Sequence, residues 1–400
     1  MKIEFIHCGD LHLGHFPNHI EERFQDYFKA LMDIINYAIS HRVPFILVSG
    51  DFFHLKAINA RTLQHTVSLL KRAKEHQVRF FVIEGNHDKA FYVDEDSWLT
   101  FLDQQGYITL LRGQIEEGKW RPTANSIFQT EGLRIIGVEY LGGATSKHLD
   151  DIYEAIPKSD DFTVVMMHAA IDRLSGQEMG DIRSKDILRW QDKVDYVALG
   201  HIHNRYEVAD FCYNPGSMEN IHIRDIQAKE KGFYHISIDG KKKDVLYIAA
   251  KPRVVHYEKL DMSDFSSPME AGESVLNRKY NFKAGNMASI ILYGKTSYNA
   301  YLIDSKAIED ALQTKYHLLH IEVENKINII KNETGLNEEV NMQALLKTLM
   351  EDQLRFYYPD VTDIEEWGKV MMDATELLKE DADFDTIIDH LYQRESKDEN

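Results

Sequence analysis

The first half of the chain is predicted to fold as a layered α/β domain. Short apolar runs of buried-strand length alternate there with segments whose apolar residues recur at helical spacing. Five of these runs are followed, directly or after one glycine, by an ionisable or amide side chain. Because the functional sites of α/β sheets assemble at the carboxyl ends of strands, the same pattern predicts where the site lies.

The predicted domain contains five strands and two helices. The strands are expected at Ile3–Cys8, Phe45–Ser49, Phe80–Glu84, Thr163–Met167 and Tyr196–Leu199. Apolar residues recur at helical spacing from Phe24 to Ala38, which predicts a helix between the first two strands. A second helix is expected over Ala60–His76, so the chain begins as strand, helix, strand, helix, strand.

The pattern of apolar residues changes after Lys251-Pro252-Arg253, which indicates a second, smaller unit. The stretch Asp261–Gly272 is poor in apolar residues, and we expect it to be a linker or loop. Beyond it the pattern predicts a strand, a helix and a further strand, at Met287–Tyr293, Asp304–Lys315 and Leu318–Val323. We therefore expect a first domain over residues 1–255 and a small α/β unit over residues 256–330.

Residues 331–400 form a third, acidic part in which three helical patterns follow one another. This part holds 19 acidic and 7 basic residues, a net of -12, which leaves -7 of the chain's net charge of -19 for residues 1–330. Acidity concentrated at one end says more about a protein partner than about a substrate. A self-contained helical bundle and a docking module for a partner both fit the pattern.

The composition limits the chemistry and the location of the protein. The two cysteines, Cys8 and Cys212, lie in strand-like contexts without zinc-binding or redox spacing, so we expect reduced core thiols. Any metal chemistry must then rest on carboxylates and imidazoles. We expect a cytoplasmic protein without a membrane span, because no segment resembles a signal peptide and no apolar run reaches eighteen residues.

Five short motifs follow the predicted strands. They are Gly9-Asp10-Leu11-His12, Gly50-Asp51-Phe52-Phe53-His54, Gly85-Asn86-His87-Asp88, Met167-His168-Ala169 and Gly200-His201-Ile202-His203. A single Asp-x-His or His-x-His is weak evidence, whereas five such motifs in chain order are strong. Alternate residues of an extended chain project to the same side, so both ligands of one motif can converge on one site.

This set of side chains favours a site for two divalent metal ions. Two cations about 3.5 to 4 Å apart can neutralise a phosphodiester, generate hydroxide and stabilise a leaving oxygen. Carboxylate and imidazole ligands without thiolate favour Mn²⁺, with Fe or Zn as alternatives. Such a pair needs a bridging carboxylate, for which we choose Asp51, while Asn86 supplies a neutral oxygen ligand.

The motifs resemble those of the calcineurin-like metallophosphoesterases and, more narrowly, of the SbcD-type DNA double-strand-break-repair nucleases. The narrower resemblance rests on Asp-Leu-His-Leu-Gly at 10–14, Gly-Asp-Phe-Phe-His at 50–54, and Gly-His-Ile-His at 200–203 followed by Asn214-Pro215-Gly216-Ser217. The resemblance in motifs extends to about residue 255. Beyond that residue only the order of the predicted domains is similar. The resemblance implies a β-sandwich flanked by helices, a small α/β capping domain that positions DNA, and a C-terminal helical region.

The resemblance also implies a role for each candidate site residue. One metal would be held by Asp10, His12 and His203, the other by Asn86, His168 and His201, with Asp51 as the bridge. His87 resembles the residue that contacts the scissile phosphate and helps to protonate the leaving 3′-oxygen, a role that suits an imidazole. Asp88 either orients that imidazole or serves the structure, and His54 resembles a second supporting histidine.

By the same resemblance the protein would be a nuclease subunit that acts on DNA ends and recruits an SbcC-like coiled-coil ATPase. Residues 331–400 would dock the ATPase, and helices around Leu63–Leu70 and Trp98–Leu102 would form a homodimer, although their apolar residues fit a core equally well. The main alternative is a metal-dependent phosphodiesterase acting on a small-molecule or nucleotide substrate. A purely structural subunit is disfavoured, because it has no need of seven intact ligands.

Overall fold

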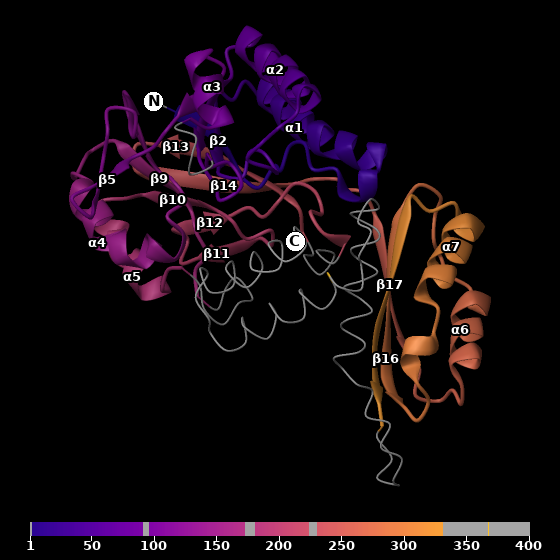
Figure 1. Cartoon of the computed structure of the whole chain (residues 1–400). Coiled ribbons are helices and arrows are strands. Elements are labelled where there is room, and N and C mark those ends of the chain that lie inside the picture. The colour runs from indigo at the N-terminus through magenta and orange to yellow at the C-terminus, as the bar shows by residue number, and fades with distance from the viewer. Residues whose placement is uncertain (1, 91–95, 173–180, 224–229, 331–366, 368–400) are drawn as a thin grey trace, which may run out of the picture. The chain divides into compact units, whose positions relative to one another are not determined.

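The computed structural model describes all of the chain except residues 1, 91–95, 173–180, 224–229, 331–366 and 368–400 (Figure 1). The chain divides into two compact units, Met1–Ile330 and Lys331–Asn400. The fold below is that of the first unit. The helices and the docking module predicted over 331–400 lie, apart from Trp367, outside the described residues.

Two six-stranded sheets form the larger part of this unit. The first has the order β14-β13-β1-β2-β3-β4, with strands Lys242–Ala249, Gly232–Asp239, Lys2–Cys8, Phe45–Ser49, Arg79–Ile83 and Thr109–Leu110. The second has the order β11-β12-β10-β9-β8-β7, with strands Tyr206–Val208, Cys212–Asn214, Tyr196–Gly200, Phe162–His168, Leu133–Val138 and Ile127–Thr130. A separate hairpin pairs β5 (Gln114–Glu116) with β6 (Lys119–Arg121).

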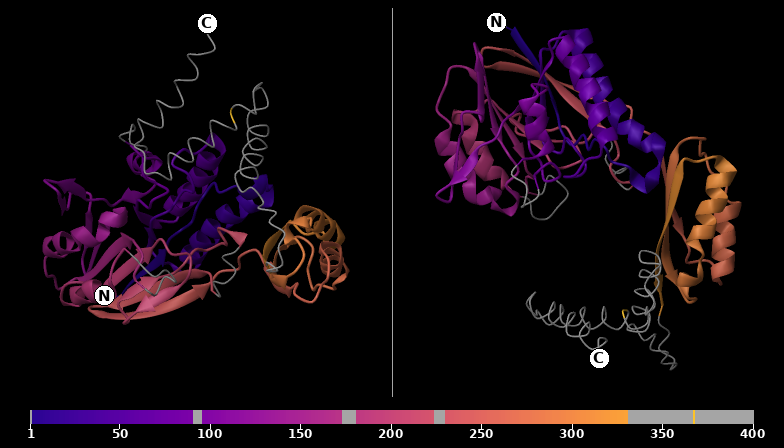
Figure 2. Two further views of the ribbon diagram at one scale, coloured as in Figure 1. Left: turned by 60° about the horizontal axis from the view of Figure 1, so that its bottom comes forward. Right: turned by 45° about the horizontal axis from the view of Figure 1, so that its top comes forward.

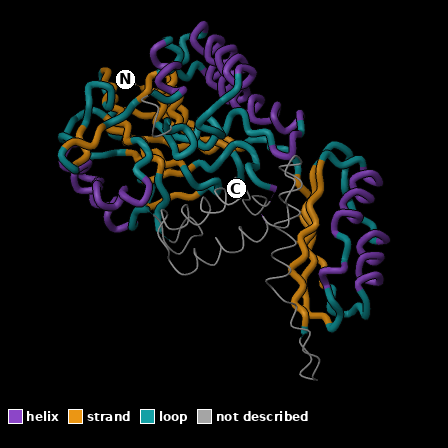
Figure 3. The backbone as a smooth tube through the Cα atoms, viewed as in Figure 1, coloured by secondary structure: helices purple, strands orange, loops and turns teal. Residues whose placement is uncertain are grey.

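The two sheets face each other and are covered by helices on their outer faces (Figures 1 and 3). The first carries α1 (Glu21–His41), α2 (Ala60–Glu75) and α3 (Trp98–Gln104), and the second carries α4 (Thr145–Ala155) and α5 (Ser184–Leu188). The alternation of β1 shows the layering: Ile6 and Cys8 belong to the core under α1, whereas Phe5 belongs to the core shared with the second sheet. The predicted α/β class is therefore confirmed.

The predicted strands recur, but they are divided between the two sheets. β1, β2 and β3 lie side by side in the first sheet and β9 and β10 in the second, all paired in parallel within their sheet. The strands β13 and β14 were not predicted. Both predicted core cysteines, Cys8 and Cys212, are confirmed as buried and free.

A third sheet holds the three parallel strands β15 (Val255–Asp261), β16 (Met287–Thr296) and β17 (His320–Ile329). The helices α6 (Pro268–Asn277) and α7 (Ser305–Tyr316) cover one of its faces (Figure 2). They share with the sheet a core of their own, which includes Leu260, Val275, Ile290, Leu292 and Leu312.

The prediction of a linker over Asp261–Gly272 is wrong in its second half, where α6 begins. The side chain of Ser267 accepts a hydrogen bond from the Glu270 N–H, and Pro268 occupies the first helical turn. A serine cap followed by proline starts a helix even where apolar residues are few. In the described part of the chain, no helix is long and apolar enough to cross a membrane.

A buried ion pair joins α1 to the segment after β12. The guanidinium of Arg23, 2% exposed, donates to the carboxylate of Glu219 and to the carbonyl of Asn220. Asp26 accepts from the same guanidinium at 2.7 Å and from the Nε of Arg253 at 2.6 Å. This network ties the first helix to two segments that are distant in sequence.

We expect Arg23→Met to lower the free energy of unfolding by about 3–5 kcal/mol, because the Glu219 carboxylate would remain buried without its partner. Urea unfolding followed by circular dichroism measures the change. The double variant Arg23→Met/Glu219→Met should lose clearly less. Lys29→Met, which removes an exposed pair with Asp33 on the same helix, is the matched control and should change little. Equal losses in Arg23→Met and Lys29→Met would contradict this interpretation.

Candidate metal centre

The five motifs come together at one edge of the sandwich. The strands β1, β2 and β3 of the first sheet and β9 and β10 of the second all end there. His168, the last residue of β9, pairs in register with Gly200 at the end of β10. Its Nδ1 also donates to the carbonyl of Ser49, 2.7 Å away at the end of β2 in the opposite sheet. The site is thus assembled across the seam between the two sheets.

A first group of ligand atoms comes from Asp10, His12 and His203, which all lie within 4.8 Å of one another. The Nε2 atoms of His12 and His203 are 3.2 Å apart. The Asp10 carboxylate also accepts the backbone N–H of His201 at 3.1 Å, which fixes the loop after β10 against the loop after β1.

A second group comes from Asp51, His168 and His201, again within 4.8 Å of one another. Asn86 adds an amide oxygen, which lies 3.1 Å from Nε2 of His168 and 3.2 Å from Nδ1 of His201. Because Nδ1 of His168 donates to the Ser49 carbonyl, Nε2 is the ring nitrogen that faces the group and would bind a metal ion after losing its proton.

The carboxylate of Asp51 faces both groups. Its Oδ2 is 3.3 Å from Nε2 of His168 and 3.7 Å from Nε2 of His12. Burial by itself would raise the pKa of Asp51, but the charge and hydrogen bond of His168, together with His12 and the His87 N–H, hold it below its usual range. Burial lowers the pKa of His168, and Asp51 more than reverses this to about 9. The pair therefore carries opposite charges within hydrogen-bonding distance.

The backbone is strained at these residues. Asp10, His12, Asp51 and His201 have φ values of 51°, 46°, 51° and 91°, in the left-handed region that side chains other than glycine rarely adopt. Such strain persists only where the surrounding structure enforces it, and it concentrates at functional sites. Gly85 allows its loop to approach Asp51 closely, because a Cβ at this position would collide with the Asp51 carboxylate.

His87 and His54 border the first group and form a third cluster with His12. The ring Nδ1 of His87 donates to the carbonyl of His54 at 2.6 Å. The backbone N–H of His87 donates to the carboxylate of Asp51 at 3.0 Å. The rings of His54 and His87 are stacked at 5.3 Å, and Nδ1 of His54 is 3.3 Å from Nδ1 of His12. Both rings are half-buried, so this side of the site is open.

Asp88 lies beneath the site and binds backbone. Its carboxylate accepts from the N–H groups of Phe52, Phe53 and Gly85 at 3.0, 2.8 and 3.0 Å. Burial and the nearby Asp51 raise the pKa of Asp88 to about 7, although the three N–H donors oppose the shift. Of the two predicted roles, this geometry favours the structural one, since the imidazole of His87 is oriented by a carbonyl instead.

Several supporting groups were not predicted. Asn214 donates to the carbonyl of Ile202 at 2.7 Å, and Lys231 donates to the carbonyl of His203 at 3.1 Å. Together they hold the loop that carries the last two histidines. Asn214 belongs to the Asn-Pro-Gly-Ser motif noted in the sequence, whereas Lys231 has no local signal. The centre of the His15 ring lies 3.7 Å from that of the His54 ring.

The donor set fits two divalent cations. The donors are carboxylate oxygens, an amide oxygen and imidazole nitrogens. They converge from five loops, and the ligand atoms within each group lie close together. Asp10 and Asp51 are at most 2% exposed, so their ionised carboxylates need compensating positive charge. A sandwich with this centre at its strand ends defines a metal-dependent phosphoester hydrolase.

The chain belongs to the calcineurin-like phosphoesterase family. Residues 3–205, more than half of the chain, match this family. The matched region contains all five motifs and ends just after His203.

Curated relatives carry a more particular name. The chain is 23% identical over 387 residues to the DNA double-strand break repair protein Mre11 of Sulfolobus acidocaldarius, covering 93% of this chain and 94% of that protein. It is 24% identical over 293 residues to the protein of the same name from Archaeoglobus fulgidus, covering 70% and 64%. A dimetal phosphatase from Danio rerio is structurally similar at a TM-score of 0.37 and 12% identity, over 62% of this chain and 99% of the other.

We expect Asp88→Asn to weaken metal binding about 10–100-fold, as is usual when a group that orients metal-binding loops is altered. The amide cannot accept all three N–H donors as a carboxylate does. Calorimetric titration of chelator-treated protein with Mn²⁺ measures the change. Asp103→Asn is the matched control, because Asp103 accepts the Leu110 N–H away from the site. A Mn²⁺ affinity of Asp88→Asn within twofold of wild type would contradict the proposal that Asp88 orients the metal-binding loops.

Proposed function

We propose that this protein is a Mn²⁺-dependent DNA exonuclease and endonuclease of double-strand-break repair, the SbcD-type subunit of an SbcCD-like complex. One observation carries the proposal. The Asp51 carboxylate faces two separate ligand groups, Asp10 with His12 and His203 on one side and His168, His201 and Asn86 on the other. That arrangement suits a bridged pair of cations and a phosphodiester substrate.

The protein's own residues divide the work of hydrolysis. Two divalent cations, when bound, supply the charge that neutralises the phosphate and activates water. A bond forms between the water oxygen and phosphorus as the water releases a proton to solvent, and the bond from phosphorus to the 3′-oxygen breaks. His87 directs its Nδ1 proton to the His54 carbonyl, which leaves Nε2 as the ring nitrogen that gives a proton to the leaving oxygen.

The choice of DNA as substrate rests on the extent of the relationship. The match to the Sulfolobus acidocaldarius repair protein covers 93% of this chain, far more than the 203 residues that match the phosphoesterase family. A minimal phosphodiesterase has no need of the third sheet and its two helices. The alternative, a phosphodiesterase acting on a small molecule or nucleotide, uses the same metal centre and is separated from the proposal by its substrate.

The proposed partners are a coiled-coil ATPase and a second copy of the chain. The acidic residues 331–400 would dock the ATPase, in keeping with their composition. For a homodimer, α2 and α3 are the proposed contact. Leu70, Leu99 and Leu102 are buried in the protomer's own core. Leu63, Leu69 and Trp98 are only partly buried and Phe101 is 38% exposed, so these four side chains remain for a partner.

We expect the purified chain to degrade end-labelled linear duplex and hairpin DNA in the presence of Mn²⁺ and to stop when a chelator is added. Asp51→Asn should lose both cleavage and metal binding, because both ligand groups lose the carboxylate that they share. His87→Gln should keep metal binding and lose cleavage by about 10²–10⁴-fold, the usual contribution of a proton donor. Gel assays and Mn²⁺ titration separate the two effects.

His148→Gln serves as the control, since His148 lies on α4 and pairs with Asp151 instead of the metal groups. Cleavage of a generic phosphodiester without any cleavage of DNA, with or without a candidate ATPase, would favour the small-molecule alternative over the nuclease.

A chain that lacks residues 331–400 should lose ATPase binding while it keeps Mn²⁺-dependent cleavage, because all proposed ligands lie before residue 204. Co-purification with the candidate ATPase measures the first property. Unchanged ATPase binding would assign these residues to internal packing.

A further inference from the structure

The strand β8 reaches the metal centre without supplying a metal ligand. It runs parallel to β9, and its last residue, Val138, pairs with Met167, which directly precedes His168. Because parallel strands end at the same edge of a sheet, the residues after β8 lie beside the imidazoles that follow β9 and β10. The residue found there is Tyr140, which belongs to none of the five motifs.

The ring of Tyr140 lies against the second ligand group. Its centre is 5.7 Å from that of the His168 ring and 5.7 Å from that of the His201 ring. His87, in contrast, borders the first group, where its ring lies 4.9 Å from that of His12. Two side chains that are not ligands therefore flank different ligand groups.

The backbone of Tyr140 is fixed in this position. Its N–H donates to the carbonyl of Glu84 at 2.9 Å, just after β3 in the opposite sheet. The preceding side chain serves the structure, because the carboxylate of Glu139 accepts the Gly113 N–H at 2.8 Å. Tyr140 is thus held by a bond between the two sheets, as His168 is.

The hydroxyl of Tyr140 makes no hydrogen bond to any residue in the described part of the chain. The hydroxyl of Tyr27, for comparison, donates to the carbonyl of Asn220 at 3.0 Å. A phenylalanine ring would pack against the two imidazoles equally well, so packing does not account for the oxygen atom. The hydroxyl of this half-buried side chain therefore remains for a ligand.

The chemistry of this hydroxyl suits an anionic oxygen as its partner. A phenol has an ordinary pKa of about 10, so it is neutral near pH 7 and can donate its proton. The carboxylate of Asp181, which acts on Tyr140 electrostatically, is already bound by the Ala170 N–H at 2.9 Å. Cations on the two ligand groups would attract a phosphodiester, whose non-bridging oxygens are strong acceptors.

We propose that Tyr140 is a further substrate-binding residue, whose hydroxyl donates a hydrogen bond to a non-bridging oxygen of the phosphodiester at the second ligand group. This inference rests on the proposed function in that the substrate is a phosphodiester. His87 then serves the leaving oxygen from the side of the first group, and Tyr140 holds the phosphate from the side of the second.

Tyr140→Phe tests the proposal, because it removes the hydroxyl and keeps the ring against His168 and His201. It should raise KM for bis(p-nitrophenyl) phosphate and for end-labelled DNA about 10–100-fold, the usual effect of losing one hydrogen bond to a charged group, and leave kcat within about twofold. The matched control is Tyr153→Phe on α4, whose hydroxyl donates to Asp192 instead, and it should change neither constant. An unchanged KM in Tyr140→Phe would overturn the proposal.

Metal affinity separates this role from a structural one. If the hydroxyl only ordered the ligands, Tyr140→Phe would weaken Mn²⁺ binding together with catalysis. We expect calorimetric titration to give a Mn²⁺ affinity within about twofold of wild type, because the ring that packs on the imidazoles is retained. A loss of Mn²⁺ affinity that accounts for the change in KM would also refute the substrate-binding role.

The outcome is distinguishable from failure of the nuclease proposal. If wild type hydrolyses bis(p-nitrophenyl) phosphate but no DNA, and Tyr140→Phe raises KM for that ester, the role of Tyr140 stands and the nuclease does not. If neither substrate is hydrolysed, calorimetric titration of the Mn²⁺-loaded protein with inorganic phosphate decides. Weaker phosphate binding in Tyr140→Phe than in wild type supports the role, whereas equal affinity, or no binding to either protein, refutes it.

Discussion

The Asp51 carboxylate is the constraint to which the rest of the centre is fitted. It reaches both ligand groups because the chain leaves β2 through two residues with positive φ, Gly50 and Asp51. The neighbouring loop approaches closely enough only because Gly85 has no side chain. Asp88 then ties the two loops together through three backbone N–H groups. Strain at one residue is thus held by packing and hydrogen bonds from its neighbours.

Three carboxylates, Asp10, Asp51 and Asp88, are buried within this small volume. Mutual repulsion and desolvation both disfavour their ionised forms, which is why the pKa values of Asp10 and Asp88 are raised. The pKa of Asp51 is lowered instead, because His168 lies within hydrogen-bonding distance of its carboxylate. The excess of buried negative charge destabilises the metal-free centre, and it also gives the centre a high affinity for divalent cations. Affinity for metal and local instability therefore have one electrostatic origin.

Much of this fold could be predicted from the sequence, because buried strands and an amphipathic helix leave strong periodic signals. β2 has the predicted limits, and the ligand candidates follow predicted strands. The division of the strands between two sheets could not be predicted, since strands buried on both faces read alike in either sheet. α6 was missed because its start is marked by capping, at Ser267, more than by apolar residues.

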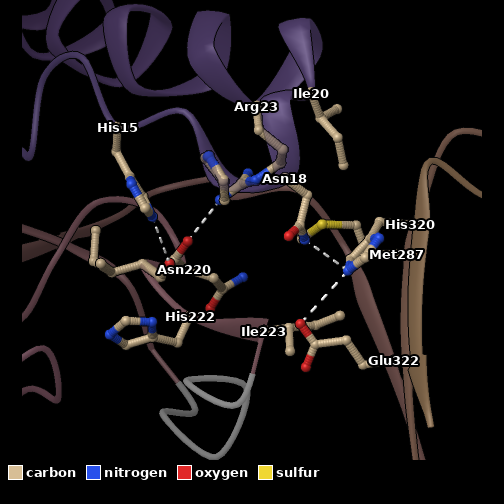
Figure 4. A pocket seen from close by; sticks show the side chains of 12 residues that line it. His15, Asn18, Ile20, Arg23, Asn220, His222, Ile223, Met287, His320 and Glu322 are labelled. Carbon is tan, nitrogen blue, oxygen red and sulfur yellow. Dashed lines mark hydrogen bonds and ion pairs between the residues drawn. The ribbon is translucent and has the colours of Figure 1, made fainter. Parts of the chain in front are cut away.

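The supporting groups of the centre were harder to predict for a related reason. The Ser49 carbonyl that orients His168 is backbone, and Lys231 reaches the His203 carbonyl from a segment without a motif. A pocket of about 510 Å³ draws its lining from four segments, which are residues 15–23, residues 220–223, Met287 of β16, and His320 with Glu322 of β17 (Figure 4). Only tertiary structure brings such segments together, whereas each metal motif carries its own local signal.

The ion-pair network around Arg23 links these features. Glu219, which binds Arg23, also accepts the backbone N–H of Arg253 at 2.6 Å, and Arg253 donates to the carbonyl of Gly285 at 2.7 Å. Asn220, beside Glu219, lines the pocket of about 510 Å³. One set of charges therefore connects the first helix, a pocket wall and the loop before β16. Directional bonds of this kind add little net stability compared with apolar packing, but they specify the relative position of the segments that they join. Two members of this network, Arg23 and Asn220, line the pocket, so the buried charges fix the position of this wall.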